Sequence, residues 1–334
     1  LLGTVATPGT WTEAEVADLR GLGLDHLYVI LDLPGAGQAL ADAASNARAL
    51  DTRLRIALRN GSADDVAGLA PLLRGNADFV DVVYAFRSDQ PVTSAEWLEE
   101  VRAILGPDIA IGGGTDVYFT ELNRQPPDLA ALDWVNLSIT PQQHGSGDRT
   151  VLQNVAALRP IAENLPRIAG TTPVSVSPLS LRPRANAYAS DPGSDVSNDA
   201  FPASVDTRQC TWFAAAWLAL ALRNLALPGT VSAITCFEAL GWRGLRESDS
   251  GSPAGFPSRP GQRFAAYDVI RGIRGFDRVL DVESTDPERF DALAVTQFTI
   301  AGDATVDVKW LRGGALGTVE ESFVSRLAPG DRFL

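Results

Sequence analysis

The sequence predicts an α/β fold, a (β/α)8 TIM barrel followed by a small C-terminal antiparallel β appendage. Eight short apolar runs rich in Val, Ile and Leu are bounded by turn residues, as buried strands are. Amphipathic helical stretches separate these runs, which is typical of parallel strands joined by right-handed crossovers. Eight such units over about 275 residues match the usual size of a TIM barrel. A doubly wound open sheet is the alternative, but the segment Gly3–Gly9, which includes the end of the first run, is not the Gly-rich phosphate loop of that fold.

The eight runs predict the barrel strands in chain order. Each is bounded by turn residues and is too short for an ordinary helix. The predicted strands are Leu1–Ala6, His26–Leu31, Arg53–Leu58, Phe79–Phe86, Ile109–Gly113, Trp134–Ile139, Pro173–Leu179 and Ser232–Phe237.

The segments between the runs predict helices. Thr12 opens a Thr-Glu-Ala-Glu segment that matches a capping box. Ala63–Leu73 begins with a pair of aspartates, which suit a helix N-terminus, and Ser94–Leu105 carries an apolar stripe at helical spacing. The other helices are expected over Gly35–Leu50, Val151–Ile168, Arg208–Leu227 and Gln262–Ile273.

After about Asp277 the pattern changes to alternating apolar and polar residues with Gly-rich breaks. This pattern predicts an antiparallel sheet that packs on the barrel, because it is too small to be very stable alone. Residues 1–275 are therefore expected to form the catalytic barrel and residues 276–334 a β-rich accessory domain. The four expected strands are Arg278–Val282, Ala292–Ile300, Ala304–Leu311 and Ala315–Phe323.

Composition disfavours several classes of partner. The net charge of −13 argues against nucleic acid, because neutralising phosphate needs clustered Lys and Arg. No apolar stretch reaches the roughly 18 residues of a membrane span, and no signal peptide is visible, so a cytoplasmic protein is expected. With two histidines and two separated cysteines, a catalytic zinc site is not expected, and we expect no cofactor. The oligomeric state is left open.

In a TIM barrel the functional residues follow the C-terminal ends of the strands. After the fifth predicted strand, three glycines lead into a segment crowded with polar and aromatic groups, in which Glu121 is the candidate catalytic carboxylate. The alternative is an irregular loop in which Glu121 pairs with Arg124 at the surface. The candidate substrate-binding residues of this segment are Thr115, Asp116, Tyr118, Asn123 and Arg124.

The next two strand ends supply further candidates. After the sixth strand, Gln142 could bind substrate and His144 could position it or donate a proton, although a loop histidine bonded to backbone is the alternative. After the seventh strand, Arg182, Arg184 and Asn186 are candidate binding residues. Two arginines there suit a carboxylate or a developing oxyanion, and a surface salt bridge is the alternative.

After the eighth strand a lone carboxylate, Glu238, ends an apolar run and precedes Trp242 and Arg243. Glu238 is the second candidate catalytic residue. Trp242 offers a flat apolar face for a sugar-like ring, and Arg243 a cation. A structural glutamate paired with Arg243 is the alternative.

The two glutamates are expected three strands apart. Retaining glycosidases of clan A also use two glutamates three strands apart, with the carboxyl groups about 5–5.5 Å from each other. Here the predicted strands are the fifth and eighth, whereas the clan uses the fourth and seventh. Thr120 also precedes Glu121 where the clan has Asn, which weakens the case for ordinary glycoside hydrolysis.

The same segments resemble the D-apionate lactonase family. The matching stretches are Gly113–Arg124, Pro141–His144, Val176–Asn186 and Thr235–Gly244. The resemblance extends from about Leu1 to Gly275. It implies a glycosidase-like barrel that hydrolyses the lactone of a branched sugar acid, D-apionolactone, to D-apionate.

Three functions therefore compete. The first is lactone hydrolysis by the glutamate pair, with the arginines and His144 stabilising the oxyanion. The second is glycoside hydrolysis by the same pair, for which nearby cations are less suited, since its transition state is cationic. The third is a non-catalytic carbohydrate-binding barrel. In each case the partner is a small carbohydrate-derived molecule, and the Ser- and Asp-rich segment Ala187–Asp206 is expected to border the pocket.

Overall fold

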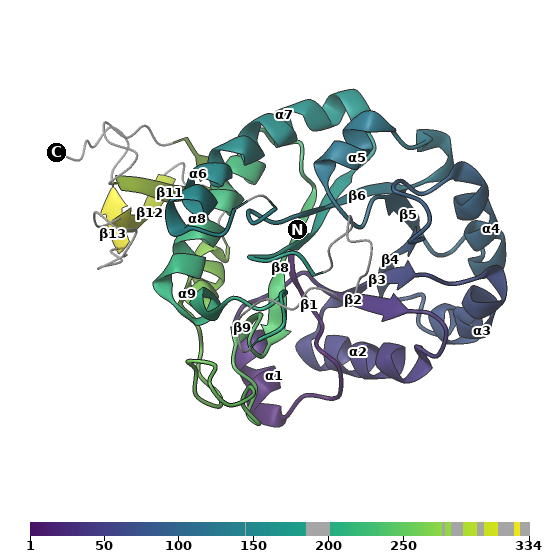
Figure 1. Cartoon of the computed structure of the whole chain (residues 1–334), viewed down its shortest axis with the longest axis horizontal. Coiled ribbons are helices and arrows are strands. Elements are labelled where there is room, and N and C mark those ends of the chain that lie inside the picture. The colour runs from purple at the N-terminus through teal and green to yellow at the C-terminus, as the bar shows by residue number, and fades with distance from the viewer. Residues whose placement is uncertain are drawn as a thin grey trace.

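The computed structural model describes residues 1–143, 145–184, 201–275, 278–281, 290–298, 304–312 and 324–327. Within them, eight parallel strands pair in chain order, and β1 also pairs with β8, which closes a TIM barrel (Figure 1). The predicted fold is confirmed. The strands are β1 Leu2–Val5, β2 His26–Asp32, β3 Arg53–Arg59, β4 Val80–Phe86, β5 Ile111–Gly114, β6 Trp134–Ile139, β7 Val174–Leu179 and β8 Ala233–Leu240, with an additional β9 Gly244–Arg246 beside β8.

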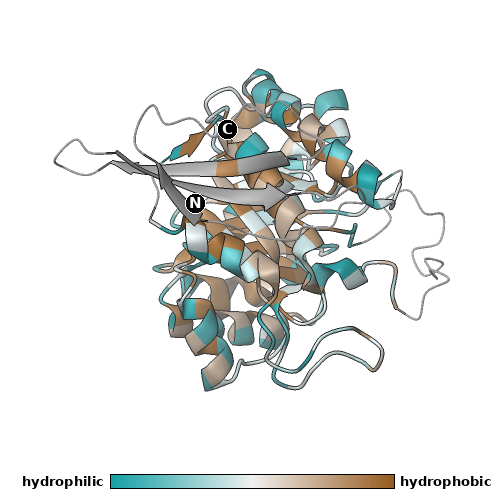
Figure 2. Ribbon diagram, turned by 90° about the vertical axis from the view of Figure 1, so that its left-hand side faces the viewer, coloured by the Kyte–Doolittle hydropathy of each residue, from teal (hydrophilic) through white to brown (hydrophobic). Residues whose placement is uncertain are grey.

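The helices surround the strands (Figure 1), and hydrophilic residues appear on their outer turns (Figure 2). The capping box at the first helix is confirmed, because Thr12 and Glu15 bond reciprocally to each other's backbone. The helices are α1 Glu13–Arg20, α2 Gly37–Leu50, α3 Ala63–Arg74, α4 Ala95–Leu105, α5 Phe119–Arg124, α6 Asp148–Gln153, α7 Leu158–Ala169, α8 Trp212–Ala226 and α9 Ala265–Ile273.

Two predicted elements differ in the structure. The single helix predicted over Val151–Ile168 is broken into α6, a 3-10 turn at Asn154–Ala157 and α7. Pro160 explains the break, because it has no N–H to donate to a carbonyl four residues earlier. The segment Phe119–Arg124, predicted as a loop, forms the six-residue helix α5, which is too short to show a helical period in the sequence.

The barrel interior is partly polar. His26 Nε2 lies 2.9 Å from Thr235 Oγ1, which lies 2.6 Å from Ser177 Oγ, and Ser177 Oγ lies 2.7 Å from Ser175 Oγ. A large apolar cluster fills the layer between the strands and the helices. The closed, packed interior leaves the ends of the barrel as the places where a ligand can bind.

The C-terminal strands form a four-stranded antiparallel sheet, comprising β10 Arg278–Leu280, β11 Phe290–Phe298, β12 Ala304–Arg312 and β13 Val324–Leu327. β10 and β11 contact α8, and Leu293 is fully buried in the main apolar cluster. The predicted strand Ala315–Phe323 lies outside the described residues. The domain boundary at residue 275 stays a prediction.

Candidate active site

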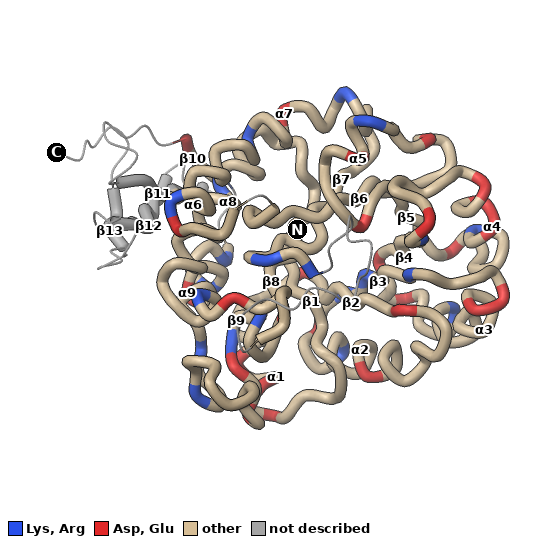
Figure 3. Tube along the Cα trace, viewed as in Figure 1, with Lys and Arg blue, Asp and Glu red and all other residues tan. Residues whose placement is uncertain are grey.

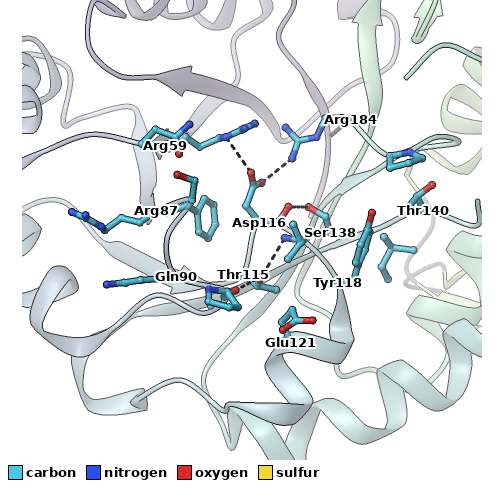
Figure 4. A pocket seen from close by; sticks show the side chains of 18 of the residues that line it. Arg59, Arg87, Gln90, Thr115, Asp116, Tyr118, Glu121, Ser138, Thr140 and Arg184 are labelled. Carbon is cyan, nitrogen blue, oxygen red and sulfur yellow. Dashed lines mark hydrogen bonds and ion pairs between the residues drawn. The ribbon is translucent and has the colours of Figure 1, made fainter. Parts of the chain in front are cut away.

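A cavity of about 590 Å³ opens where β3 to β7 end (Figure 4). Figure 3 shows basic residues on the outer helices and also, close to β8 and β3, toward the middle of the barrel. The charged residues that line the cavity are Arg59, Arg87, Asp116, Glu121 and Arg184. This position is the one at which TIM barrels hold their active sites.

Asp116 lies between two arginines in this cavity (Figure 4). Arg184 Nη2 donates to Asp116 Oδ1 at 2.8 Å, and Arg59 Nε lies 3.3 Å from Asp116 Oδ2. Arg59 Nε is also 3.3 Å from Oδ1 of Asp32, the last residue of β2. Burial lowers the pKa of the Arg184 guanidinium, but the charge and hydrogen bond of Asp116, with contributions from Tyr28 and Glu238, together outweigh burial and hold that pKa above its ordinary value.

Hydrogen bonds to residues of β6 hold the segment that follows β5. Gly114 has φ +101°, and a Cβ there would lie 2.6 Å from the Asn136 carbonyl oxygen, so only glycine fits this close approach. Thr115 N donates to the Asn136 carbonyl at 2.9 Å, and Ser138 Oγ donates to the Asp116 carbonyl at 3.0 Å. These bonds set the backbone on either side of the Asp116 side chain. Two further predicted residues, Thr115 and Tyr118, also line the cavity.

Glu121 is buried on α5 and lines the cavity. Its Oε1 lies 3.3 Å from Nη1 of Arg124, so the ion pair considered as an alternative does form, but with a buried glutamate. Arg124 and Asn123 are exposed on the outer side of α5, where Asn123 accepts a hydrogen bond from Arg167 of α7. The structure therefore does not bring Asn123 and Arg124 into the cavity.

Glu238 follows a distortion in β8. The β1–β8 pairing shifts between Gly3 and Val5, and one extra β8 residue is accommodated where Phe237 adopts φ 51°. A positive φ in a bulky residue is strained, and such strain is concentrated at functional sites. A bulge also redirects the side chain that follows it, here Glu238.

Glu238 Oε1 lies 2.7 Å from Nη2 of Arg243, whose Nη1 donates to Ser204 Oγ at 3.0 Å. The pairing considered as the structural alternative is thus present. Glu238 also lines a small pocket together with Arg182 and Arg243, and this pocket shares Ser180 and Arg184 with the main cavity. Glu121 therefore lines the main cavity and Glu238 the small pocket, and Arg184 lies in the wall that the two share.

A buried polar cluster supports this wall. Gln142 Nε2 donates to the Leu181 carbonyl at 2.7 Å and to Asp206 Oδ2 at 2.8 Å, and Arg182 Nε lies 3.3 Å from the same Asp206 oxygen. Burial raises the pKa of Asp206, but hydrogen bonds from Arg208 and Gln142 outweigh it and lower that pKa to about 2. Gln142 was predicted to bind substrate, but both of its amide N–H groups donate to protein acceptors.

Trp242 packs in an aromatic cluster. Its ring lies edge-on to Phe201, with centroids 6.1 Å apart, and to Phe256, with centroids 6.3 Å apart. It lines neither the cavity nor the small pocket. Two other predicted site residues, His144 and Asn186, lie outside the described residues, as do positions 187–200 of the predicted pocket-bordering segment.

The sequence-based search missed Arg59, at the end of β3, and Arg87, just after β4. Both residues lie at strand ends before the fifth strand, whereas the predicted site residues all follow the fifth to eighth strands. A charged residue that closes an apolar run, as Arg59 does, was the available signal.

The part of the chain that the structure describes contains no group of three or more His, Cys, Asp or Glu side chains arranged to hold a metal ion. None of its helices combines the length and the apolar character that crossing a membrane requires.

The fold and the position of the site define a TIM barrel with a charged cavity at its C-terminal mouth. The family model "D-apionate lactonase, TIM barrel domain" matches residues 2–277, and the chain belongs to this family. A D-apionate lactonase of Brucella anthropi is 32% identical over 123 residues, which cover 34% of this chain and 20% of that relative. The match therefore spans about a fifth of the relative's length.

A second family model, "Large helicase-related protein, winged helix domain", matches residues 267–334. The described residues of that stretch include most of α9 and strands β10–β13. The expectation that nucleic acid is not a partner stays a prediction.

Among solved structures, a β-glucuronidase from Ruminococcus gnavus in complex with D-glucaro-d-lactam has a TM-score of 0.52 at 11% identity, covering 81% of this chain and 49% of that chain. The same enzyme in complex with D-glucuronic acid has a TM-score of 0.51 at 11% identity, with the same coverage. At this identity the likeness shows the fold alone.

Proposed function

We propose that this chain is the catalytic barrel of a hydrolase that opens the lactone of a sugar acid, with D-apionolactone or a close analogue as substrate. The observation that carries the proposal is the shared wall at the barrel mouth, where Arg184 separates the Glu238 pocket from the cavity that Glu121 and Asp116 line. Membership of the lactonase family supports the choice of substrate class.

In the proposed reaction, one glutamate removes a proton from water, whose oxygen bonds to the lactone carbonyl carbon. The carbonyl oxygen takes up negative charge, and Arg184 stabilises it from the cavity wall. The bond from the carbonyl carbon to the ring oxygen then breaks, and the ring oxygen accepts a proton. We assign Glu238 as the base, because it follows the strained Phe237 and is oriented by Arg243, and Glu121 as the proton donor.

Three hydroxyl groups in the cavity support a polyhydroxylated substrate. Ser138 donates to the Asp116 carbonyl, Thr140 to the Leu181 carbonyl and Ser180 to the Arg182 carbonyl. A hydroxyl has one proton, so each retains only acceptor capacity. Such acceptors are complementary to the hydroxyl protons of a sugar acid.

Glycoside hydrolysis is the second candidate. It is favoured by the two glutamates, because Glu121 follows β5 and Glu238 lies near the end of β8, three strands further on. Its transition state is cationic, however, and guanidinium groups at Arg59, Arg184 and Arg243 would oppose that charge. The cations at the mouth therefore favour the lactone.

A substrate panel tests the proposal. The chain is assayed with lactones of four- to six-carbon sugar acids, including D-apionolactone, and with 4-nitrophenyl glycosides, after subtraction of the spontaneous lactone hydrolysis rate. We expect release of acid from at least one lactone and no release of nitrophenol. As a matched control, Glu163→Gln changes an exposed glutamate on α7 and should keep full activity. Hydrolysis of the glycosides alone would refute the proposal, and so would the absence of turnover on every substrate of the panel.

A further inference from the structure

We propose that Arg59 and Arg184 together form a binding site for a carboxylate, the carboxylate of the sugar acid that the reaction releases. The inference rests on the proposed function for the identity of that acid. It predicts that the product binds in the main cavity and competes with the substrate.

The two guanidinium groups approach Asp116 from opposite sides (Figure 4). Arg59 comes from the end of β3 and Arg184 from the segment after β7, and both line the cavity. Within the described residues, the bond from Arg184 Nη2 to Asp116 is the one hydrogen bond that either guanidinium makes. A guanidinium carries five N–H donors, so most donors of this pair are available to a ligand.

The local charges favour an anion. Asp116 carries one negative charge between two cations, and it is itself only 17% exposed at its side chain. The other carboxylate on Arg59 is Asp32, whose side chain is 63% exposed, so water screens its charge. Among the three groups Arg59, Arg184 and Asp116, two positive charges thus face one buried negative charge.

The chemistry of lactone opening links this site to the product. The lactone carbonyl oxygen, which becomes negative when water adds, is one of the two oxygens of the carboxylate after the ring C–O bond breaks. The second carboxylate oxygen comes from water, which loses one proton to Glu238 during the attack and the other to solvent when the acid ionises. Donors that stabilise the developing charge therefore also hold the product, and arginine suits two carboxylate oxygens at once.

Calorimetric titration tests the site with four probes, the salts of D-apionate and D-ribonate and the corresponding alditols, apiitol and ribitol. Each alditol keeps the hydroxyl groups and lacks the carboxylate. We expect at least one sugar acid to bind about 10-fold or more tightly than its alditol, because hydrogen bonds to charged groups are the stronger ones. If neither acid exceeds its alditol, the proposal is wrong, and this comparison needs no variant.

Variants locate the site. Arg59→Gln and Arg184→Gln should each weaken sugar-acid binding about 10- to 100-fold and leave alditol binding within about 3-fold. Arg87→Gln is the matched control, since Arg87 lines the same cavity and has an exposed ion pair with Asp89. Equal losses in Arg87→Gln and Arg59→Gln would contradict the assignment, because they would indicate a diffuse field.

This experiment separates the two proposals. Titration measures binding without turnover, so arginine-dependent binding of the acid without lactone hydrolysis would remove only the proposed reaction. Lactone hydrolysis without arginine-dependent binding of the acid would remove only the carboxylate site.

Discussion

The two ends of the barrel hold arginine–aspartate pairs of nearly the same geometry. Toward the N-terminal end, Arg55 Nη2 lies 2.6 Å from Asp81 Oδ2, and its guanidinium lies 4.2 Å from the centre of the Trp134 ring. At the C-terminal mouth, Arg184 Nη2 lies 2.8 Å from Asp116 Oδ1. Pair distance therefore does not distinguish the two ends.

The difference lies in the space beside each pair. Arg55 is fully buried, and the Trp134 ring covers its guanidinium, so a ligand has no access to it. Arg184 lines the cavity and also the Glu238 pocket. A cation that is fully covered acts on stability, whereas one that lines a cavity can exchange part of its bonding for a substrate.

The largest effect is expected at Glu238. Glu238→Gln keeps the shape but removes the charge and the ability to accept a proton, so lactone kcat/KM should fall about 10²- to 10⁴-fold, or further if the glutamate attacks the carbonyl directly. Steady-state kinetics and denaturant unfolding of the same sample measure activity and stability separately.

Glu163→Gln on α7 is the control for the loss of one carboxylate. Wild-type turnover in both Glu238→Gln and Glu121→Gln would mean that the glutamate pair is structural. The charged groups at the C-terminal mouth would then act on stability alone, as the Arg55–Asp81 pair is expected to do toward the N-terminal end.

The arginines test the comparison directly. Arg184→Gln should lower lactone kcat/KM about 10²- to 10³-fold, with little change in the free energy of unfolding, because Arg59 still pairs with Asp116. Arg55→Gln should lower the free energy of unfolding by about 2–3 kcal/mol, because it removes a fully buried cation from Asp81 and the Trp134 ring, and should leave kcat/KM of the folded enzyme unchanged. If Arg184→Gln and Arg55→Gln both lowered the free energy of unfolding and left kcat/KM unchanged, access to the cavity would not explain the difference between the two ends of the barrel.

The fold was largely predictable because buried parallel strands and amphipathic helices have different periods. The predicted strand His26–Leu31 differs from β2 by one residue at its end. The prediction failed where local signals are weak, at the six-residue α5 and the three-residue β9. It also ended the eighth strand at Phe237, although β8 continues to Leu240.

The site was less predictable than the fold. The sequence indicates which residues follow strand ends, and Asp116, Glu121 and Arg184 line one cavity. It does not indicate that Asn123 faces α7, because that depends on the orientation of a short helix. A left-handed phenylalanine at position 237 has no sequence signal either, since tertiary contacts impose it.

A smaller effect is expected at Asp206, a covered ion pair near the mouth. Asp206→Asn should lower the free energy of unfolding at pH 7 by roughly 2 kcal/mol, because the pKa of Asp206 is lowered from 3.8 to about 2 in the folded protein. This contribution is present above the unfolded pKa and is lost as the pH falls toward 2. Asp148→Asn is the matched control, because it removes a 51% exposed partner of the same Arg208 and should cost about 0.5 kcal/mol or less. Equal costs would show that burial does not decide the contribution.

The smallest effect concerns His26, at the N-terminal end of the barrel. Burial, and then the positive charges of Arg55 and of the N-terminal amine, hold the pKa of His26 well below 6.5. The unfolded chain therefore binds a proton that the folded protein does not, and stability should fall as the pH decreases below about 6.5. Between pH 7 and 5.5 the expected loss is about 1 kcal/mol, measured as the free energy of unfolding in denaturant. His26→Gln should show a smaller slope over this range, whatever its absolute stability, because it cannot take up that proton. The other histidine of the chain, His144, is the same in both proteins, so the difference between their slopes isolates His26. Parallel slopes would mean that His26 is protonated in the folded barrel, and that its N-terminal end admits charge as readily as the mouth does.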